Sequence, residues 1–300
     1  MYKLEVPKVL KRGDTIALIS ISGGRAGDED MLYRYEAGKR RLEEIWGVHV
    51  IPTPNALAGS AFLYEYPEAR AEDFMWAMQD QEINGIICMM GGDDSYRVLP
   101  YIDINVIKNN PKVFMGYSDI TSWMAVFAKA GIRAYYGPNL LTPIAQPVAL
   151  DNYTKEAITK CLFSTEIIGE VPACSEYTNI EWRNAGKDEI KWVSNTGYRL
   201  VQGSGVVQGR IWGGLHELRA LDAAGMFRHA AGIVVGQLSE EEENMLVKFL
   251  KYEARREDIP VLSNVDFVHR TPMTVVPMGA MAEIDCSRVA FSIMEPGVAH

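Results

Sequence analysis

Pro111-Lys-Val-Phe-Met-Gly-Tyr-Ser-Asp-Ile-Thr121 is the stretch in which an apolar strand pattern gives way to a helix. Residues 112–117 have the apolar pattern of a buried strand, and residues 119–130 have the spacing of an amphipathic helix. Ser118 lies at the elbow between them. A helix start offers free N–H groups, so this hydroxyl could attack a carbonyl whose oxyanion those donors stabilise. The alternative is that Ser118 or Asp119 only caps the helix.

The same alternation runs through the first half of the chain. Apolar and amphipathic runs predict strand 15–20, helix 31–45, strand 48–52, helix 67–79, strand 85–90, strand 112–117 and helix 119–130. This order predicts an α/β fold with a parallel sheet and helices on both faces. Ligands of such sheets bind at the carboxyl ends of the strands. Loops 20–28 and 91–95 and the Ser118 elbow are expected there.

A change of composition predicts a second, smaller α/β domain. Residues 140–152 are rich in proline and small side chains, so we expect a boundary near residues 145–170. We assign residues 1–165 to an N-terminal domain that carries the nucleophile and 166–300 to a C-terminal domain. The pattern of the second part predicts strands 206–212, 232–237, 260–264 and 282–286, and helices 215–224 and 240–256.

Composition and charge exclude several classes of protein. The 300 residues are 48% hydrophobic, which is enough for a large core. The net charge of -9 gives no electrostatic footprint for nucleic acid or for an anionic membrane surface. No apolar run approaches the roughly 20 residues that a membrane-spanning helix needs, and the first residues lack the apolar core of a signal peptide. We therefore expect a cytoplasmic protein with no nucleic-acid or membrane partner.

The cysteines give no sign of a metal or disulfide framework. They are scattered, and none forms a C-x-x-C pair, which argues against zinc and against a secreted disulfide scaffold. The four are Cys88, Cys161, Cys174 and Cys286. Neither residues 22–24 nor residues 91–92 complete a nucleotide-binding fingerprint. We expect reduced thiols.

Two further segments are candidates for the chemistry around Ser118. Gly91-Gly92 follows a buried strand and could supply a second oxyanion donor beside the Asp119 N–H, although glycines also end strands for steric reasons alone. A serine nucleophile needs a base. His269 lies on a predicted loop between strands, where catalytic groups concentrate. A plain surface histidine is the alternative.

Four motifs follow one another along the chain: GGDDSYRVLPYID at 91–103, PKVFMGYSDIT at 111–121, VQGRIWGG at 207–214, and VHRTPM at 268–273 with PMGAMAEID at 277–285. In order, and over most of the length, they resemble the motifs of the LD-carboxypeptidase family of serine peptidases. Their details resemble the microcin C self-immunity branch more closely than the murein tetrapeptide branch.

The resemblance implies roles for individual residues. The N-terminal α/β domain would carry the nucleophile, and the smaller C-terminal domain would carry the rest of a Ser-His-Glu triad. Ser118 matches the nucleophile and His269 the base, while the backbone donors of Gly92 and Asp119 match the oxyanion hole.

The resemblance also implies a substrate and an assembly. The family cleaves an amide next to a free or carboxylate-bearing end, without a metal or organic cofactor, and its members are commonly dimers, so we expect a homodimer. The substrate would be a small peptide or a peptide-nucleotide conjugate. Gly91, Trp182 and Trp192 lie in matching substrate-binding regions, although a tryptophan there could simply be packing.

The third member of the triad is where the sequence departs from the family pattern. By this resemblance, one helix and the strand that bears the catalytic glutamate are missing between Gly214 and Leu215. Glu217 is the nearest candidate by position, although a glutamate on a helix usually faces solvent. Asp266 and Gln237 are further alternatives. A catalytically silent binding protein with the same fold is therefore the competing hypothesis.

Overall fold

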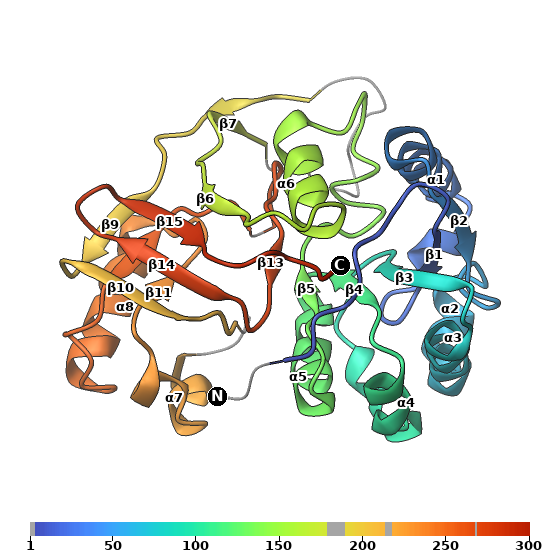
Figure 1. Cartoon of the computed structure of the whole chain (residues 1–300), viewed down its shortest axis with the longest axis horizontal. Helices are drawn as coiled ribbons and strands as arrows, with labels where there is room; N and C mark the ends of the chain where they lie inside the picture. Colours follow the sequence, from blue (N-terminus) through green and yellow to red (C-terminus); the bar gives the residue numbers. More distant parts are fainter. Residues whose placement is uncertain (1–3, 179–189, 214–217, 268) are drawn as a thin grey trace.

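The computed structural model describes residues 4–178, 190–213, 218–267 and 269–300 (Figure 1). The α-helices are α1 Leu32–Trp46, α2 Ser60–Glu65, α3 Pro67–Gln79, α4 Ile104–Asn109, α5 Thr121–Ala130, α6 Asn152–Leu162, α7 Leu218–Ala223 and α8 Glu240–Tyr252. The short 3-10 helices are η1 Arg25–Gly27, η2 Ser95–Tyr101, η3 Ser118–Ile120 and η4 Met226–His229. None of the helices in these ranges is long and apolar enough to cross a membrane.

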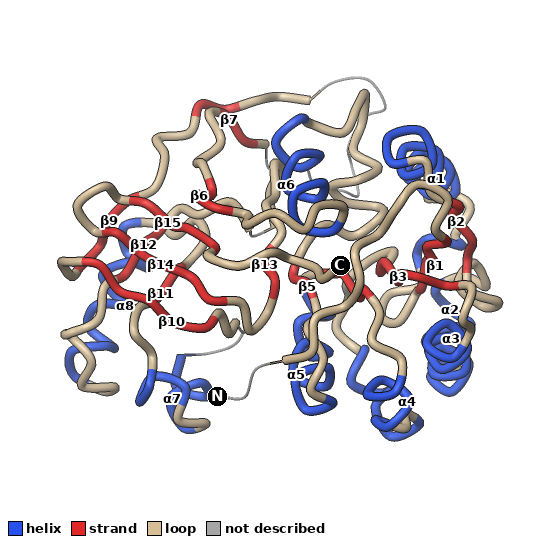
Figure 2. Tube along the Cα trace, viewed as in Figure 1, coloured by secondary structure: helices blue, strands red, loops and turns tan. Residues whose placement is uncertain are grey.

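The strands form two main groups, which Figure 2 shows in red on either side of the molecule. They are β1 Thr15–Ile19, β2 His49–Pro52, β3 Ile83–Cys88, β4 Val113–Gly116, β5 Tyr135–Tyr136, β6 Gly169–Val171, β7 Glu176–Tyr177, β8 Val193–Ser194, β9 Arg199–Gln202, β10 Val206–Arg210, β11 Ile233–Val234, β12 Val261–Ser263, β13 Val276–Pro277, β14 Met281–Asp285 and β15 Ala290–Ile293.

A six-stranded sheet forms the centre of the N-terminal part, in the order β13-β5-β4-β3-β1-β2. The strands from β5 to β2 are parallel, and β13 joins the edge antiparallel to β5. The predicted mixed α/β fold with a parallel sheet is therefore confirmed. Parallel strands are buried on both faces, which explains why they read as continuous apolar runs in the sequence.

Helices cover both faces of this sheet (Figure 1). On one face, α3 and α5 supply Phe74, Trp123 and Phe127, which pack together with Phe114 of β4. On the other face, α1 and α6 bury a second apolar cluster against alternate residues of the same strands. Both faces of the sheet are covered by apolar side chains, so the polar loops lie at the ends of the strands.

The C-terminal part consists of smaller sheets. An antiparallel sheet has the order β10-β14-β15-β6, and a mixed sheet has the order β11-β12-β9. Several predicted elements are present but shorter: strand 232–237 is Ile233–Val234, and helix 240–256 ends at Tyr252. Helix α8 begins with a capping box in which Ser239 and Glu242 bond each other's backbone, so its acidic first turn stabilises the helix start.

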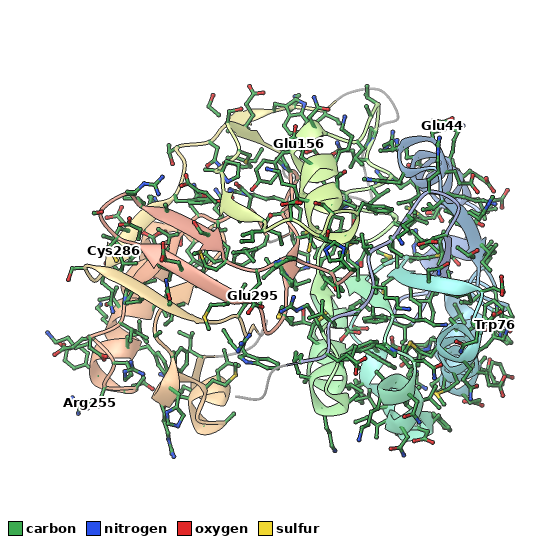
Figure 3. The ribbon with its side chains drawn as sticks, viewed as in Figure 1. Glu44, Trp76, Glu156, Arg255, Cys286 and Glu295 are labelled. Atoms are coloured by element: carbon green, nitrogen blue, oxygen red, sulfur yellow. The ribbon has the colours of Figure 1, made fainter. Side chains whose placement is uncertain are left out.

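The two parts meet along a polar junction. Glu295 lies between the two groups of strands (Figure 3). Its carboxylate pairs with Arg133 at 2.8 Å and with Arg210 of β10 at 3.4 Å. Because Arg133 lies two residues before β5 of the large sheet, this carboxylate joins the N-terminal sheet to the C-terminal one. The division at residues 165 and 166 stays a prediction.

Candidate active site

Ser118 lies in a strained turn at the carboxyl end of β4. Tyr117 is extended, and Ser118 then adopts a φ of +65°, a left-handed conformation that is uncommon for a residue with a side chain. The turn is fixed on both sides: the Tyr117 amide donates to Asn139 Oδ1 at 3.2 Å, and Thr121 Oγ1 donates to the Ser118 carbonyl at 2.5 Å. Such strain persists only where the surroundings enforce it, and it is common at functional sites.

The helix-cap alternative can be checked directly. No side chain caps η3 or α5 within the described part of the chain. The Asp119 carboxylate instead accepts hydrogen bonds from Ser22 Oγ at 2.6 Å and from the Ser95 amide at 2.8 Å. The Ser118 hydroxyl instead contacts the ring of His269.

Ser118 Oγ lies 2.8 Å from Nε2 of His269, across 151 residues of sequence. This is hydrogen-bonding distance, and a nucleophilic hydroxyl paired with an imidazole is the arrangement in which the ring can accept the proton of the attacking oxygen. The structure thus brings together the two residues that the sequence selected.

The loop that carries His269 is anchored on its C-terminal side. Arg270 is 4% exposed and forms an ion pair with Asp266 at 2.6 Å, and its guanidinium lies over the ring of Tyr177. Thr271 exchanges backbone hydrogen bonds with Thr178, at 2.7 and 3.1 Å. These contacts fix the backbone on the C-terminal side of His269.

The environment of the His269 ring favours its neutral form. Although the residue is partly exposed, desolvation by the protein around it lowers the pKa of His269 below its ordinary value of 6.5. The ring of Tyr117 packs against it, with centroids 5.3 Å apart. A neutral imidazole can act as a base at neutral pH.

The glycine loop after β3 lies against Ser118. A Cβ on Gly91 would come within 2.8 Å of Ser118 Cβ and 3.1 Å of its Oγ, so only glycine permits this approach. Within the described residues, neither the Gly92 nor the Asp119 amide donates a hydrogen bond. Two free amides beside a nucleophile are suited to an oxyanion.

Several supporting residues were missed by the sequence analysis. Arg70 of α3 is 1% exposed and forms a bidentate ion pair with Asp94, both contacts being 3.0 Å. Arg70 also donates to the Ser22 carbonyl at 3.2 Å. Asp94 follows Gly92 by two residues in the GGDDS motif, and this motif was the sequence signal that could have identified it. Its partner Arg70 is 24 residues away, and no local sequence pattern links the two.

The remaining candidates are not part of the Ser118–His269 pair. Glu217 and Trp182 lie outside the described residues. Trp192 precedes β8 and is 38% exposed. Asp266 is fully buried, and its carboxylate accepts hydrogen bonds from Arg270 and from the amide and thiol of Cys174, so it anchors the loop rather than bonding to His269. Gln237 donates to Tyr177 at 3.3 Å.

All four cysteines are free and buried. Within the described ranges, no group of three or more His, Cys, Asp or Glu side chains is arranged to hold a metal ion.

Comparison with known proteins gives matches over most of the chain. The model of the LD-carboxypeptidase N-terminal domain matches residues 16–137, and that of the LD-carboxypeptidase C-terminal domain matches residues 209–284. The first match contains Ser118 and the glycine loop, and the second contains His269.

Individual relatives agree with these matches. The "Probable murein peptide carboxypeptidase" of Bacillus subtilis is 26% identical, covering 98% of this chain and 95% of its own. The microcin C7 self-immunity protein MccF of Escherichia coli is 27% identical over 75% of this chain and 78% of its own. A solved MccF-like protein from Bacillus anthracis is 26% identical, with a TM-score of 0.82 over 97% of this chain and 99% of that one. With both domain models matched in order on one chain, this protein belongs to the LD-carboxypeptidase family.

Proposed function

We propose that this protein is a serine hydrolase that cleaves an amide bond of a small peptide or peptide conjugate, with Ser118 as nucleophile and His269 as general base. The observation that carries the proposal is the 2.8 Å contact between Ser118 Oγ and His269 Nε2. Family membership supports the type of reaction, and the positive φ of Ser118 supports a functional role for this turn.

The reaction would follow the acyl-enzyme route. Ser118 Oγ attacks the carbonyl carbon while His269 Nε2 accepts the hydroxyl proton. The tetrahedral oxyanion accepts hydrogen bonds from the Gly92 and Asp119 amides. Collapse breaks the C–N bond, and His269 donates its proton to the leaving amine. Water then attacks the ester on Ser118 with His269 again as base, which releases the acid and restores the hydroxyl.

The orienting acid of the triad is the part of this mechanism that rests on sequence alone. Glu217 is the proposed candidate, by its position after Gly213-Gly214. Loss of an orienting acid in a serine peptidase lowers turnover by about 10⁴ and leaves residual activity. Hydrolysis by the Ser118–His269 pair is therefore expected even if no carboxylate supports the ring.

The proposed substrates follow from the names of the relatives. One is described as a murein peptide carboxypeptidase and another as a microcin C7 self-immunity protein, so we propose a murein LD-peptide or a peptide-nucleotide conjugate. Gly91 would border the scissile group because it touches Ser118. Trp182 and Trp192 are proposed to pack against the substrate, where the exposed ring area of Trp192 is available for stacking.

We also propose that the protein acts as a homodimer in the cytoplasm. The dimer rests on the family resemblance, and the four free cysteines are compatible with a reducing compartment. Sedimentation equilibrium at micromolar concentration tests the dimer, and a single species of 33.5 kDa would contradict it.

The central experiment compares the protein with its Ser118→Ala variant. Both are incubated with an aspartyl amide of a nucleotide analogue and with a murein LD-peptide, and separately with a fluorophosphonate probe. We expect wild-type hydrolysis of one substrate and phosphonylation of Ser118, with both lost in Ser118→Ala and retained in Ser204→Ala, which changes an exposed loop serine. No labelling of the wild type would instead support the silent binding protein.

A further inference from the structure

The Asp119 side chain joins three loops at the carboxyl end of the large sheet. Its Oδ2 accepts hydrogen bonds from Ser22 Oγ at 2.6 Å and from the Ser95 amide at 2.8 Å. Ser22 follows β1, Ser95 follows β3, and Asp119 itself follows β4, which are three adjacent strands. Both donors are buried, at 1% and 0% exposure, so the two bonds are protected from water.

These loops carry the free amides beside Ser118. Asp119 supplies one amide itself, and Gly92, three residues before Ser95, supplies the other. A second set of contacts links the same two loops through the Asp119 carbonyl. Ser95 Oγ donates to this carbonyl at 3.3 Å, and Ser122 Oγ donates to it at 2.8 Å. The two hydroxyl oxygens are 3.1 Å apart. The residue that carries one amide, Asp119, is thus tied through its carbonyl as well to the loop that carries the other amide.

The loop after β1, which carries Ser22 and Gly23, also contacts the Gly91-Gly92 loop directly. The Gly23 amide donates to the Gly91 carbonyl at 3.1 Å, and Ser22 Oγ occupies the space that a Cβ on Gly92 would need. Ser22 is therefore held between the Asp119 carboxylate and the glycine loop. A shift of this hydroxyl would move Gly92 relative to Asp119.

We propose that the Asp119 carboxylate is a positioning residue, which sets the separation of the Gly92 and Asp119 amides and so the geometry of the oxyanion hole. This inference rests on the proposed function. A carboxylate is a strong acceptor for two converging donors, and bonds of this kind are shorter and stronger than neutral ones. Its negative charge would oppose an oxyanion, so its contribution is the geometry that it imposes and not its field.

Three single substitutions and one double variant separate this role from others. Asp119→Ala removes the acceptor and both bonds. Asp119→Asn keeps one oxygen that can accept from Ser22 and from the Ser95 amide, while losing the charge. Ser22→Ala removes one donor and leaves the backbone bond from Ser95. A double variant of Ser22 and Asp119 then tests whether the two act as one unit.

The measurements are steady-state hydrolysis and the time course of fluorophosphonate labelling. In labelling, Ser118 Oγ forms a bond to phosphorus, fluoride leaves, and the proton passes to His269. Negative charge develops on the phosphoryl oxygen during this step, so the rate depends on the amides that would donate hydrogen bonds to it. We expect Asp119→Ala to lower kcat and the labelling rate constant by about 10- to 100-fold, with KM nearly unchanged. Asp119→Asn should recover most of the rate. The double variant should be no slower than Asp119→Ala.

A purely structural role gives a different result. If Asp119→Ala only reduces the folded fraction, the final extent of labelling falls while the rate constant stays at the wild-type value, and this overturns the proposal. Asp103→Ala, which removes the carboxylate that caps α4, controls for the loss of a local hydrogen bond elsewhere. A wild-type rate in Asp119→Ala also overturns the inference and leaves the proposed function intact. A wild type that neither labels nor hydrolyses overturns both.

Discussion

Arg70 of α3 forms a buried, bidentate ion pair with Asp94, which follows Gly92 by two residues. The contacts Nη1–Oδ1 and Nη2–Oδ2 are both 3.0 Å, and the Arg70 side chain is fully excluded from solvent. Arg70 also donates to the Ile21 carbonyl at 3.4 Å and the Ser22 carbonyl at 3.2 Å. One side chain of α3 therefore fixes the loops after β1 and β3 relative to each other.

Removal of the Asp94 charge should strongly destabilise the protein. In Asp94→Asn the guanidinium stays buried without its counter-ion, and breaking a buried pair in this way costs about 3 kcal/mol or more. We expect the free energy of unfolding, measured by urea denaturation, to fall by that amount. Asp103→Asn, at an exposed helix cap, should change it by less than about 1 kcal/mol. Equal losses in the two variants would show that the buried ion pair contributes no more to the free energy of unfolding than the exposed helix cap does.

Gly91→Ala should reduce activity far more than stability. The added methyl would press against Ser118, whose turn is already constrained. A displacement of the nucleophile by about 1 Å can lower the rate by about 100-fold. We expect kcat to fall 10- to 100-fold, by the same reasoning, while the melting temperature changes by only about 3 °C.

Gly209→Ala is the matched control, because among the described residues its Cβ would meet only Ala231, at 3.4 Å. It should retain near wild-type kcat. A fully active Gly91→Ala variant would show that Ser118 is not held where the reaction needs it.

The pH dependence of the reaction should reflect the lowered pKa of His269. Desolvation disfavours the charged ring, so the neutral base persists below the ordinary value of 6.5. We expect kcat/KM to fall with decreasing pH and the midpoint of that fall to lie below 6.5. The labelling rate should follow the same curve. A midpoint at or above 6.5 would contradict this.

The same shift affects folding stability in a defined direction. Well above pH 6.5, the ring is neutral in both the folded and the unfolded state. As the pH falls from 6.5 through the lower folded-state pKa, the unfolded chain binds the proton first, so stability is lost in that window. His269→Gln should show a smaller loss between these pH values, which urea titrations at each pH would measure.

The elbow shows how much of the site can be predicted from sequence. The apolar run at 112–117 and the amphipathic run after Asp119 predicted strand and helix, and they appear as Val113–Gly116 and Thr121–Ala130. A strand that is buried on both faces needs a continuous run of apolar residues, so it can be recognised from its own short segment of sequence. The left-handed φ of Ser118 could not be predicted, because it depends on contacts with Asn139 and with the glycine loop.

Contacts between distant segments account for most of what was missed. Strands β13 and β15 are short, and each is stabilised by its partner strands. Strand β13 pairs with β5, and β15 pairs with β14 and β6. The bond from Ser22 to Asp119 spans 97 residues and leaves no periodic signal. The meeting of Ser118 and His269 was expected from the ordered family motifs and not from any local pattern.

The junction between the two sheets depends on Glu295. Its partner Arg133 is 3% exposed at the side chain and otherwise donates to carbonyls, including that of Met278 at 3.2 Å. Burial by itself raises the pKa of Glu295, but the hydrogen bond and charge of Arg133 outweigh it and lower the pKa below 4.5. The folded protein therefore stabilises the ionised carboxylate, and this stabilisation is lost as the pH falls from 4.5 through the lowered value.

Glu295→Gln should therefore lower the free energy of unfolding by about 2 kcal/mol at neutral pH, because the buried Arg133 loses its counter-ion. Glu253→Gln is the control, since Glu253 pairs with Arg219 on the surface and such a pair contributes less than about 1 kcal/mol. The difference between wild type and Glu295→Gln should shrink as the pH falls from 4.5 through the lowered pKa of Glu295, because protonation then neutralises the wild-type carboxylate as well. Equal effects of the two glutamines at neutral pH would mean that the junction is held by its apolar and backbone contacts and not by this charge.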